Sequence, residues 1–400
     1  MNQPSHGYRV RWLGVAISFY AFIAIGVAEG GLGVLLPSIL TTYQLTPATI
    51  TLLFLSQVIG YLVAALSSSL LSSQLGLARL LLLAATLLAG CLGIYAVVAS
   101  WPLMVATGVL FGLGIGWIDA GINTYLANDQ RNADLMGILH AFYGLGALLG
   151  PAIATTLLAL ALNWRQVYLV FAVMVGILVL ALLWAVVTQD RSLTTKLDTA
   201  APSARASLRL ALKMPVILAA SLFLMVYVGL ESSLGNWAYS VQTISRGTPE
   251  LVAGYSVSAY WFGLSLGRLL TGRVVALVGA VKSISGSLAL LTVGLLAWWL
   301  LPGQLLSLPL LGLALATIFP TTIWLMPQRL PAHLVPGAIS LMTGLAGFGA
   351  AVIPTAVGWL ADRVGLESIP VMMLPLVVLM IGLHYWLSQI PASSAAPPAS

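Results

Sequence analysis

Charged residues are scarce in this sequence. Only 6% of its 400 residues are Asp, Glu, Lys or Arg, whereas 60% are hydrophobic. Soluble domains carry about 25% charged residues, so this composition excludes a soluble globular protein. The few charges are also unbalanced, with 16 basic against 10 acidic residues. In a membrane protein such an excess reports on orientation, and we expect no nucleic acid partner.

Cysteine is almost absent as well. Cys91 is the one cysteine of the sequence, which excludes an intramolecular disulfide. The sequence also has no His-Glu-x-x-His zinc motif and no clustered aspartates. We therefore expect no enzyme, no metal site and no cofactor. An intramembrane enzyme and a ligand-binding receptor that does not transport are the alternatives from other functional classes.

Long apolar runs occupy most of the chain. About twelve of them are long enough to cross a hydrocarbon core of about 30 Å. The predicted spans are 12–40, 48–72, 79–99, 101–127, 135–162, 164–188, 214–245, 251–277, 280–301, 303–327, 334–361 and 367–389. We therefore expect a multi-pass protein whose immediate surroundings are the lipid bilayer.

Lys and Arg concentrate on one side of these spans. If the N-terminus is inside, twelve of them fall in cytoplasmic segments, three fall outside and Arg268 is left within a span. This bias follows the positive-inside rule. It predicts cytoplasmic termini and a place in the plasma (inner) membrane.

The second half of the sequence repeats features of the first. Residues of the same type recur in the same order at offsets between 200 and 203. The pairs are Glu29 and Glu231, Gly33 and Gly235, Gly60 and Gly263, Gly76 and Gly279, and Gly112 and Gly312. Six spans followed by six spans of the same orientation form a parallel repeat.

This plan resembles the major facilitator superfamily, whose members bind solute near the bilayer midplane between two bundles. The resemblance implies an all-α membrane protein with twelve transmembrane helices in two six-helix bundles. We place the N-terminal bundle at 1–188, a cytoplasmic linker at 189–213, the C-terminal bundle at 214–390 and a disordered tail at 391–400. One chain of this kind is a complete carrier, so we expect a monomer.

Polar groups stand out in the fourth and fifth spans. Asp119 and Asn123 lie four residues apart and share one helix face, as do His140 and Tyr143 on the next helix. An ionisable group inside a membrane is costly and is a functional candidate by default. The position equivalent to Asp119 in the second half is Phe319, which argues against a symmetric structural role. A structural hydrogen bond to Asn123 is the alternative.

These motifs resemble a narrower branch. Asp119-Ala-Gly-Ile-Asn123, Leu139-His140-Ala-Phe-Tyr143 and Tyr227-Val-Gly-Leu-Glu231 are similar to fucose/glucose:proton symporters and their sodium-dependent glucose transporter relatives. In the fucose permease the acid of the first span stands at the position of Gly33. Here Glu29 lies one turn earlier, as in the sodium-dependent glucose branch. The resemblance implies a small-molecule substrate, a sugar.

We assign roles to the candidate residues from these patterns. Asp119 carries the coupling proton and His140 tunes it. The expected substrate-binding residues are Glu29, Gln57, Asn123, Tyr143, Tyr227, Glu231, Asn236 and Trp237. The expected gating or structural residues are Arg268, Gly33 and Gly235. For Glu29 and Glu231 the alternative is a symmetric role in satisfying backbone groups, and for Arg268 it is contact with an anionic substrate.

The sequence thus predicts a secondary active transporter that imports a neutral polar solute, a monosaccharide, by proton symport with alternating access. Burial favours the neutral form of a carboxyl group, which a proton-coupled carrier needs. A sodium-coupled sugar symporter and a proton-coupled exporter of drugs or metabolites are the alternatives within transporters.

Overall fold

The computed structural model describes residues 12–127, 133–188, 210–303, 306–331 and 334–390. The elements are α1 (Trp12–Gly30), α2 (Leu32–Tyr43), α3 (Pro47–Leu75), α4 (Leu77–Val97), α5 (Trp101–Ala127), α6 (Ala133–Ala159), α7 (Trp164–Val187), α10 (Pro215–Ser240), η2 (Val241–Ser245), α11 (Glu250–Val278), α12 (Ala280–Leu300), α13 (Ser307–Leu315), α14 (Ile318–Arg329), α15 (Val335–Val364), η4 (Leu366–Ser368) and α16 (Ile369–Ser388). Within these ranges, twelve helical stretches are long and apolar enough to cross a membrane. The predicted twelve-helix membrane fold is therefore confirmed.

Local signals explain where several helices begin. Thr46 caps α3 by accepting a hydrogen bond from the backbone N–H of Thr49, and Pro47 is the first residue of that helix. Asn163 and Gln166 form a reciprocal capping box at the start of α7. The turns between the long apolar runs are thus encoded by a few polar residues.

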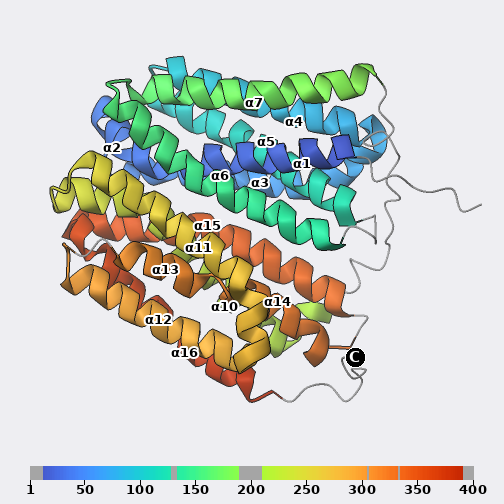
Figure 1. Ribbon diagram of the computed structural model, residues 1–400, viewed down its shortest axis with the longest axis vertical. Helices are drawn as coiled ribbons and strands as arrows, with labels where there is room; N and C mark the ends of the chain where they lie inside the picture. The colour runs from blue at the N-terminus through green and yellow to red at the C-terminus, as the bar shows by residue number, and fades with distance from the viewer. Residues whose placement is uncertain (1–11, 128–132, 189–209, 304–305, 332–333, 391–400) are drawn as a thin grey trace, which may run out of the picture.

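The helices form two groups. Helices α1 to α7 lie together in one half of the molecule and α10 to α16 lie in the other, as Figure 1 shows. The same pairs of spans pack in both groups: α1 with α6 matches α10 with α15, α3 with α5 matches α11 with α13, and α4 with α7 matches α12 with α16. Of the expected linker, residues 189–209 lie outside the described residues, as does the expected tail.

Repeated glycines give the two groups the same local geometry. A Cβ atom on Gly60 would overlap the carbonyl oxygen of Val109, and one on Gly263 would overlap that of Pro309. Gly76 and Gly279 end α3 and α11 with φ angles of 81° and 85°, which glycine adopts without steric cost. The sequence repeat is therefore a repeat of helix packing.

The two groups contact each other closely toward one end of the molecule. A Cβ atom on Gly33 of α2 would overlap the carbonyl oxygen of Gly235 in α10. One on Gly254 of α11 would overlap the hydroxyl of Thr155 in α6, and one on Gly358 of α15 would lie 2.6 Å from the Thr51 methyl group in α3. Successive spans alternate in direction, so all three contacts lie away from the ends of α7 and α10 that the linker joins.

Candidate transport site

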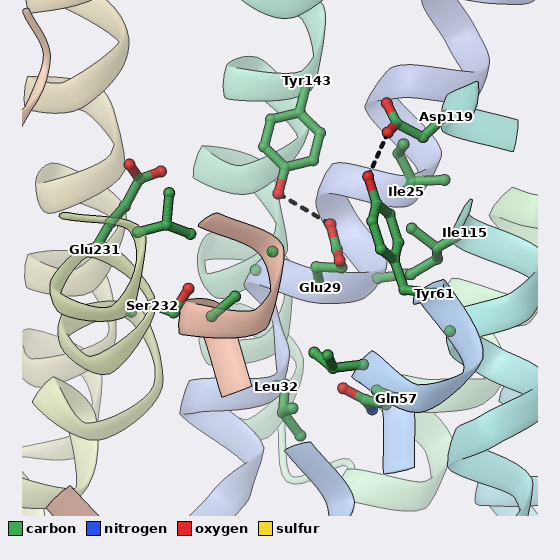
Figure 2. Close-up of a pocket in the computed structure, with 18 of the residues that line it drawn as sticks. Ile25, Glu29, Leu32, Gln57, Tyr61, Ile115, Asp119, Tyr143, Glu231 and Ser232 are labelled. Carbon is green, nitrogen blue, oxygen red and sulfur yellow. Dashed lines mark hydrogen bonds between the residues drawn. The ribbon is translucent and has the colours of Figure 1, made fainter. Parts of the chain in front are cut away.

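A cavity of about 660 Å³ lies between the two groups of helices. This volume is typical of small-molecule sites. Both groups contribute to its wall, with Glu29, Gln57, Asp119 and Tyr143 on one side and Glu231 on the other. Figure 2 shows these side chains around a common space. The cavity therefore lies where a carrier with two bundles would hold its solute.

The carboxylate of Glu29 is held by a tyrosine hydroxyl. The hydroxyl of Tyr143 in α6 donates a hydrogen bond of 2.9 Å to the carboxylate of Glu29 in α1 (Figure 2). The two helices approach closely because Gly26 and Gly146 leave no side chain between their backbones. Tyr143 is thus a positioning group for Glu29 as well as part of the cavity wall.

Asp119 is held by two neutral donors. Tyr61 of α3 donates to one carboxylate oxygen at 2.6 Å and the side-chain amide of Asn123 donates to the other at 2.8 Å. The i, i+4 spacing brings Asn123 over Asp119, and the Asn123 amide also reaches the Asp119 backbone carbonyl at 3.0 Å. The hydrogen bond to Asn123, which is the structural alternative for Asp119, is thus present, and Tyr61 is an additional partner from a second helix. The role of Asp119 in proton coupling stays a prediction.

Glu231, in contrast, has a cationic partner. The guanidinium of Arg268 in α11 lies 3.0 and 3.1 Å from the two carboxylate oxygens of Glu231 in α10. The same nitrogen lies 3.4 Å from the Tyr227 hydroxyl, and Tyr260 donates to the Glu231 backbone carbonyl at 3.0 Å. Arg268 therefore stabilises a carboxylate of the cavity wall, and solute contact by Glu231 stays a prediction.

Two expected substrate-binding residues do not line the cavity. Trp237 has no exposed surface and donates its indole N–H to the Pro354 carbonyl at 3.1 Å. Tyr227 is equally buried beneath Arg268. Tyr227 lies within the C-terminal group, whereas the Trp237 ring packs edge-on against Phe54 of the N-terminal group, with ring centroids 5.9 Å apart. The spacing of both residues around Glu231 does not reveal these directions. This placement corrects the sequence-based position of both residues.

The other candidates lie where the sequence analysis expected them or nearby. Gln57, Asn123, Asn236 and His140 line the cavity. The His140 ring packs edge-on against Phe22, with ring centroids 5.8 Å apart. Gly235 also lines the cavity, whereas Gly33 forms the backbone contact with it described above.

Tyr61 and Trp261 line the cavity wall but are not among the predicted site residues. Tyr61 follows Gln57 by four residues, and this shared face was the signal that could have found it. Trp261 precedes Arg268 by seven residues, two helical turns, and so shares its face. Tyr61 and Trp261 are both large side chains with one polar group, and each lies on the polar face of a long apolar helix.

Helix α11 contains a Gly-x-Ser-x-Gly sequence. Gly263-Leu264-Ser265-Leu266-Gly267 has the letters of the serine hydrolase elbow, which requires a sharp turn from strand to helix. Here all five residues lie inside α11. A Cβ atom on Gly144 of α6 would lie 2.5 Å from the Ser265 hydroxyl, so this serine packs at a helix crossing. In this protein the Gly-x-Ser-x-Gly sequence therefore serves packing between helices.

Breaking the Arg268–Glu231 pair should destabilise the protein. The Glu231 side chain is 12% exposed, and Arg268→Met leaves its carboxylate without a cation. Removing one partner of a buried ion pair costs about 3–5 kcal/mol, and we expect about 3 because Arg268 is 30% exposed. Thermal unfolding in detergent measures the loss. The double variant with Glu231→Gln should recover part of it, and an unchanged melting temperature in the single variant would contradict the pairing.

Known proteins are similar to this chain along most of its length. The "Bypass of stop codon protein 6" of Saccharomyces cerevisiae is 25% identical over 88% of this chain and 77% of its own. The "Glucose/mannose transporter GlcP" of Bacillus subtilis is 26% identical over 84% of this chain and 85% of its own. A crystal structure of a D-xylose-proton symporter matches with a TM-score of 0.74 at 14% identity, over 96% of this chain and 99% of that one.

The family model described as "Major Facilitator Superfamily" matches residues 17–255, more than half of the chain. The twelve apolar helices, the internal repeat and the cavity between the two groups are the architecture that this family implies. This multi-pass membrane protein is therefore a transporter and belongs to the major facilitator superfamily.

Proposed function

We propose that this protein imports a monosaccharide by proton symport with alternating access. One observation carries the proposal: Asp119 and Glu29 both face the cavity, and each is held by neutral donors. Among the residues that the structure describes, the ion pairs are Arg268–Glu231 and Arg246–Glu367. Neither carboxylate of the N-terminal group has a cationic partner among these described residues.

A bound proton supplies that missing charge. An ionised carboxylate in a closed, dehydrated cavity is costly, and protonation removes most of that cost. The carrier closes around the solute more readily once the acid is neutral. Asp119 is the coupling acid in this proposal, because it lines the cavity and Phe319 stands at its equivalent position in the second half. His140 lines the same space and tunes its protonation.

Two features support a sugar as the solute. Carboxylates accept several hydrogen bonds and suit a polyol, and Glu29, Glu231 and Asp119 lie on both walls of the cavity. Aromatic side chains of Phe54, Trp261 and Phe319 lie on the wall as well and offer apolar faces to the C–H face of a sugar ring. The related glucose/mannose transporter is described by its name as acting on this class of solute.

We place the linker and both termini in the cytoplasm, with the protein as a monomer in the plasma (inner) membrane. The close contacts at Gly33, Gly254 and Gly358 then lie on the outer side. His140 and Thr343 line the cavity, are exposed and lie nearer the linker end of their helices. The conformation described here thus opens inward.

Uptake of labelled glucose into proteoliposomes tests the proposal, with an inward proton gradient, an inward sodium gradient or neither. Accumulation with the proton gradient alone is the expected result. Accumulation with the sodium gradient alone would show that sodium is the coupling ion, while the assignment of a sugar as the solute would stand. Absence of both uptake and exchange for glucose, galactose and fucose would overturn the sugar assignment, and proton-driven efflux would make the protein an exporter.

A further inference from the structure

Trp261 presents an unsatisfied hydrogen-bond donor at the cavity wall. Its side chain is 8% exposed and lines the cavity, yet its indole nitrogen has no hydrogen-bond partner among the described residues. Buried polar groups are nearly always hydrogen-bonded, and leaving one unpaired costs about 1–3 kcal/mol. A buried orphan donor at a ligand cavity is the arrangement expected of a group that meets its partner on the ligand.

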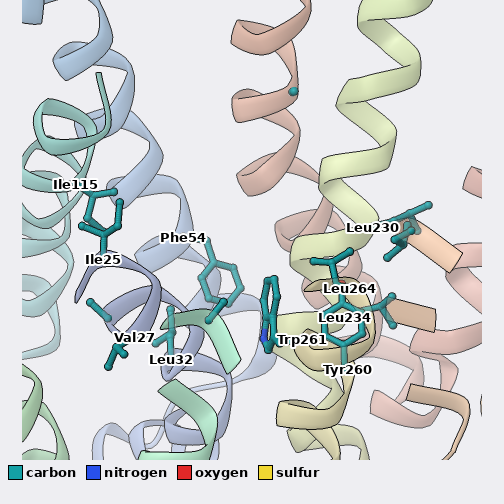
Figure 3. Close-up of a cluster of buried hydrophobic side chains, with 14 of the residues drawn as sticks. Ile25, Val27, Leu32, Phe54, Ile115, Leu230, Leu234, Tyr260, Trp261 and Leu264 are labelled. Carbon is teal, nitrogen blue, oxygen red and sulfur yellow. The ribbon is translucent and has the colours of Figure 1, made fainter. Parts of the chain in front are cut away.

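The surroundings of Trp261 hold the ring in place. The six-membered ring of Trp261 packs against Gly235. A Cβ atom on Gly235 would lie 2.8 Å from the Trp261 Cζ2 atom, so the indole fits only because residue 235 has no side chain. The Tyr260 ring packs against it at 67°, with ring centroids 5.1 Å apart. Figure 3 shows the indole nitrogen on the edge that faces Phe54 and Leu32 of the N-terminal group. The donor therefore points toward the N-terminal group.

Two other buried indoles show that position matters. Trp237 donates to the Pro354 carbonyl and does not line the cavity. Trp298 has an unpaired indole nitrogen but also lies away from the cavity, beneath the Arg246 guanidinium. In the part of the chain that the structure describes, Trp261 alone combines an unpaired indole N–H with a place on the cavity wall.

We propose that Trp261 is a specificity-determining residue whose indole N–H donates a hydrogen bond to one hydroxyl oxygen of the transported sugar. An indole N–H donates only, so the group opposite it must accept. Glu29 on the other wall is an acceptor and favours a sugar hydroxyl that donates. The Trp261 N–H thus adds a donor that binds an accepting hydroxyl oxygen, whereas the Glu29 carboxylate binds a donating hydroxyl. This inference rests on the proposed function.

The test combines Trp261→Phe with a series of monodeoxy-glucoses. Phe retains an aromatic ring and removes the N–H. Dissociation constants are measured on the full-length protein by competition with labelled glucose. We expect one deoxy analogue to bind the wild type about tenfold more weakly than glucose, and Trp261→Phe to bind glucose and that analogue equally. The interaction energy between hydroxyl and indole follows from this cycle.

Two variants serve as controls. Trp298→Phe makes the same chemical change at an unpaired indole outside the cavity, and it should keep the wild-type ranking of the deoxy series. Gly235→Ala displaces the Trp261 ring and should lose the same discrimination as Trp261→Phe. Trp261→Phe also removes packed ring atoms, so its melting temperature is measured to show that it folds, and the effect on the hydroxyl is taken from the ratio of the two affinities.

The outcomes separate this inference from the proposed function. The role of Trp261 would be overturned if Trp261→Phe still distinguished glucose from the deoxy analogue as the wild type does. It would also be overturned if the variant lost affinity equally for every analogue. In both cases the proposal of glucose transport would stand. Failure of the wild type to bind any hexose would overturn both.

Discussion

Asp119→Asn should lose uphill transport and keep exchange. The amide has the size of the carboxyl group and its oxygen still accepts from Tyr61, whereas the acceptor that faced the Asn123 amide is lost. The new amide carries no exchangeable charge, so proton movement is no longer linked to solute movement. A gradient of one pH unit supports about tenfold accumulation in a one-to-one symporter, since each pH unit is worth about 1.4 kcal/mol. The variant should only equilibrate the solute, while counterflow continues.

A matched change tests whether the effect belongs to Asp119. Asp362 is exposed near the end of α15 and does not line the cavity, so Asp362→Asn should accumulate solute as the wild type does. Proton-driven accumulation of several-fold in Asp119→Asn would assign the coupling proton elsewhere, with Glu29 as the next candidate.

Replacing Gly33 with a residue that has a side chain should block the transport cycle. The Gly33 Cα faces the Gly235 carbonyl without room for a Cβ atom, so Gly33→Ala must separate α2 from α10. Overpacking of this kind costs about 1–3 kcal/mol, which shifts a conformational equilibrium about 5- to 150-fold. We expect counterflow to slow by about tenfold in Gly33→Ala and to be lost in Gly33→Leu.

Labelling shows whether closure itself fails. In a Cys91→Ala background, Gln57→Cys places a thiol on the cavity wall. An impermeant maleimide added outside should modify this thiol faster when Gly33→Ala is present. Gly90→Ala is the control, since a Cβ atom there meets nothing within 4 Å. Normal counterflow in Gly33→Leu would show that this contact is not needed for the cycle.

The fold followed from the sequence because each of its determinants is local. Apolar runs of membrane-spanning length and polar turns fix twelve helices, and the recurring glycines reveal a repeat of helix crossings such as those at Gly60 and Gly263. Asp119 and Asn123 were found because their i, i+4 spacing fixes their shared face whatever the tertiary structure.

The missed features depend on helix rotation and on distant partners. Tyr61 meets Asp119 across 58 positions, and Arg268 meets Glu231 across 37. No periodicity within one helix reports such pairs. Trp237 was misplaced for the same reason, since only the path of α15 beside α10 shows that Pro354 receives its N–H.

The neutral Arg268–Glu231 pair also has an electrical consequence. It leaves the C-terminal wall without net charge, so the negative charge that the site moves during the cycle belongs to Asp119 and Glu29. Each ionised carboxylate that crosses the full field is driven by about 2.3 kcal/mol per 100 mV. An interior-negative potential therefore pushes the empty, anionic site outward. In the proposed cycle the return of the unloaded carrier is the voltage-sensitive step, and a cell gains most from it when its membrane is strongly polarised.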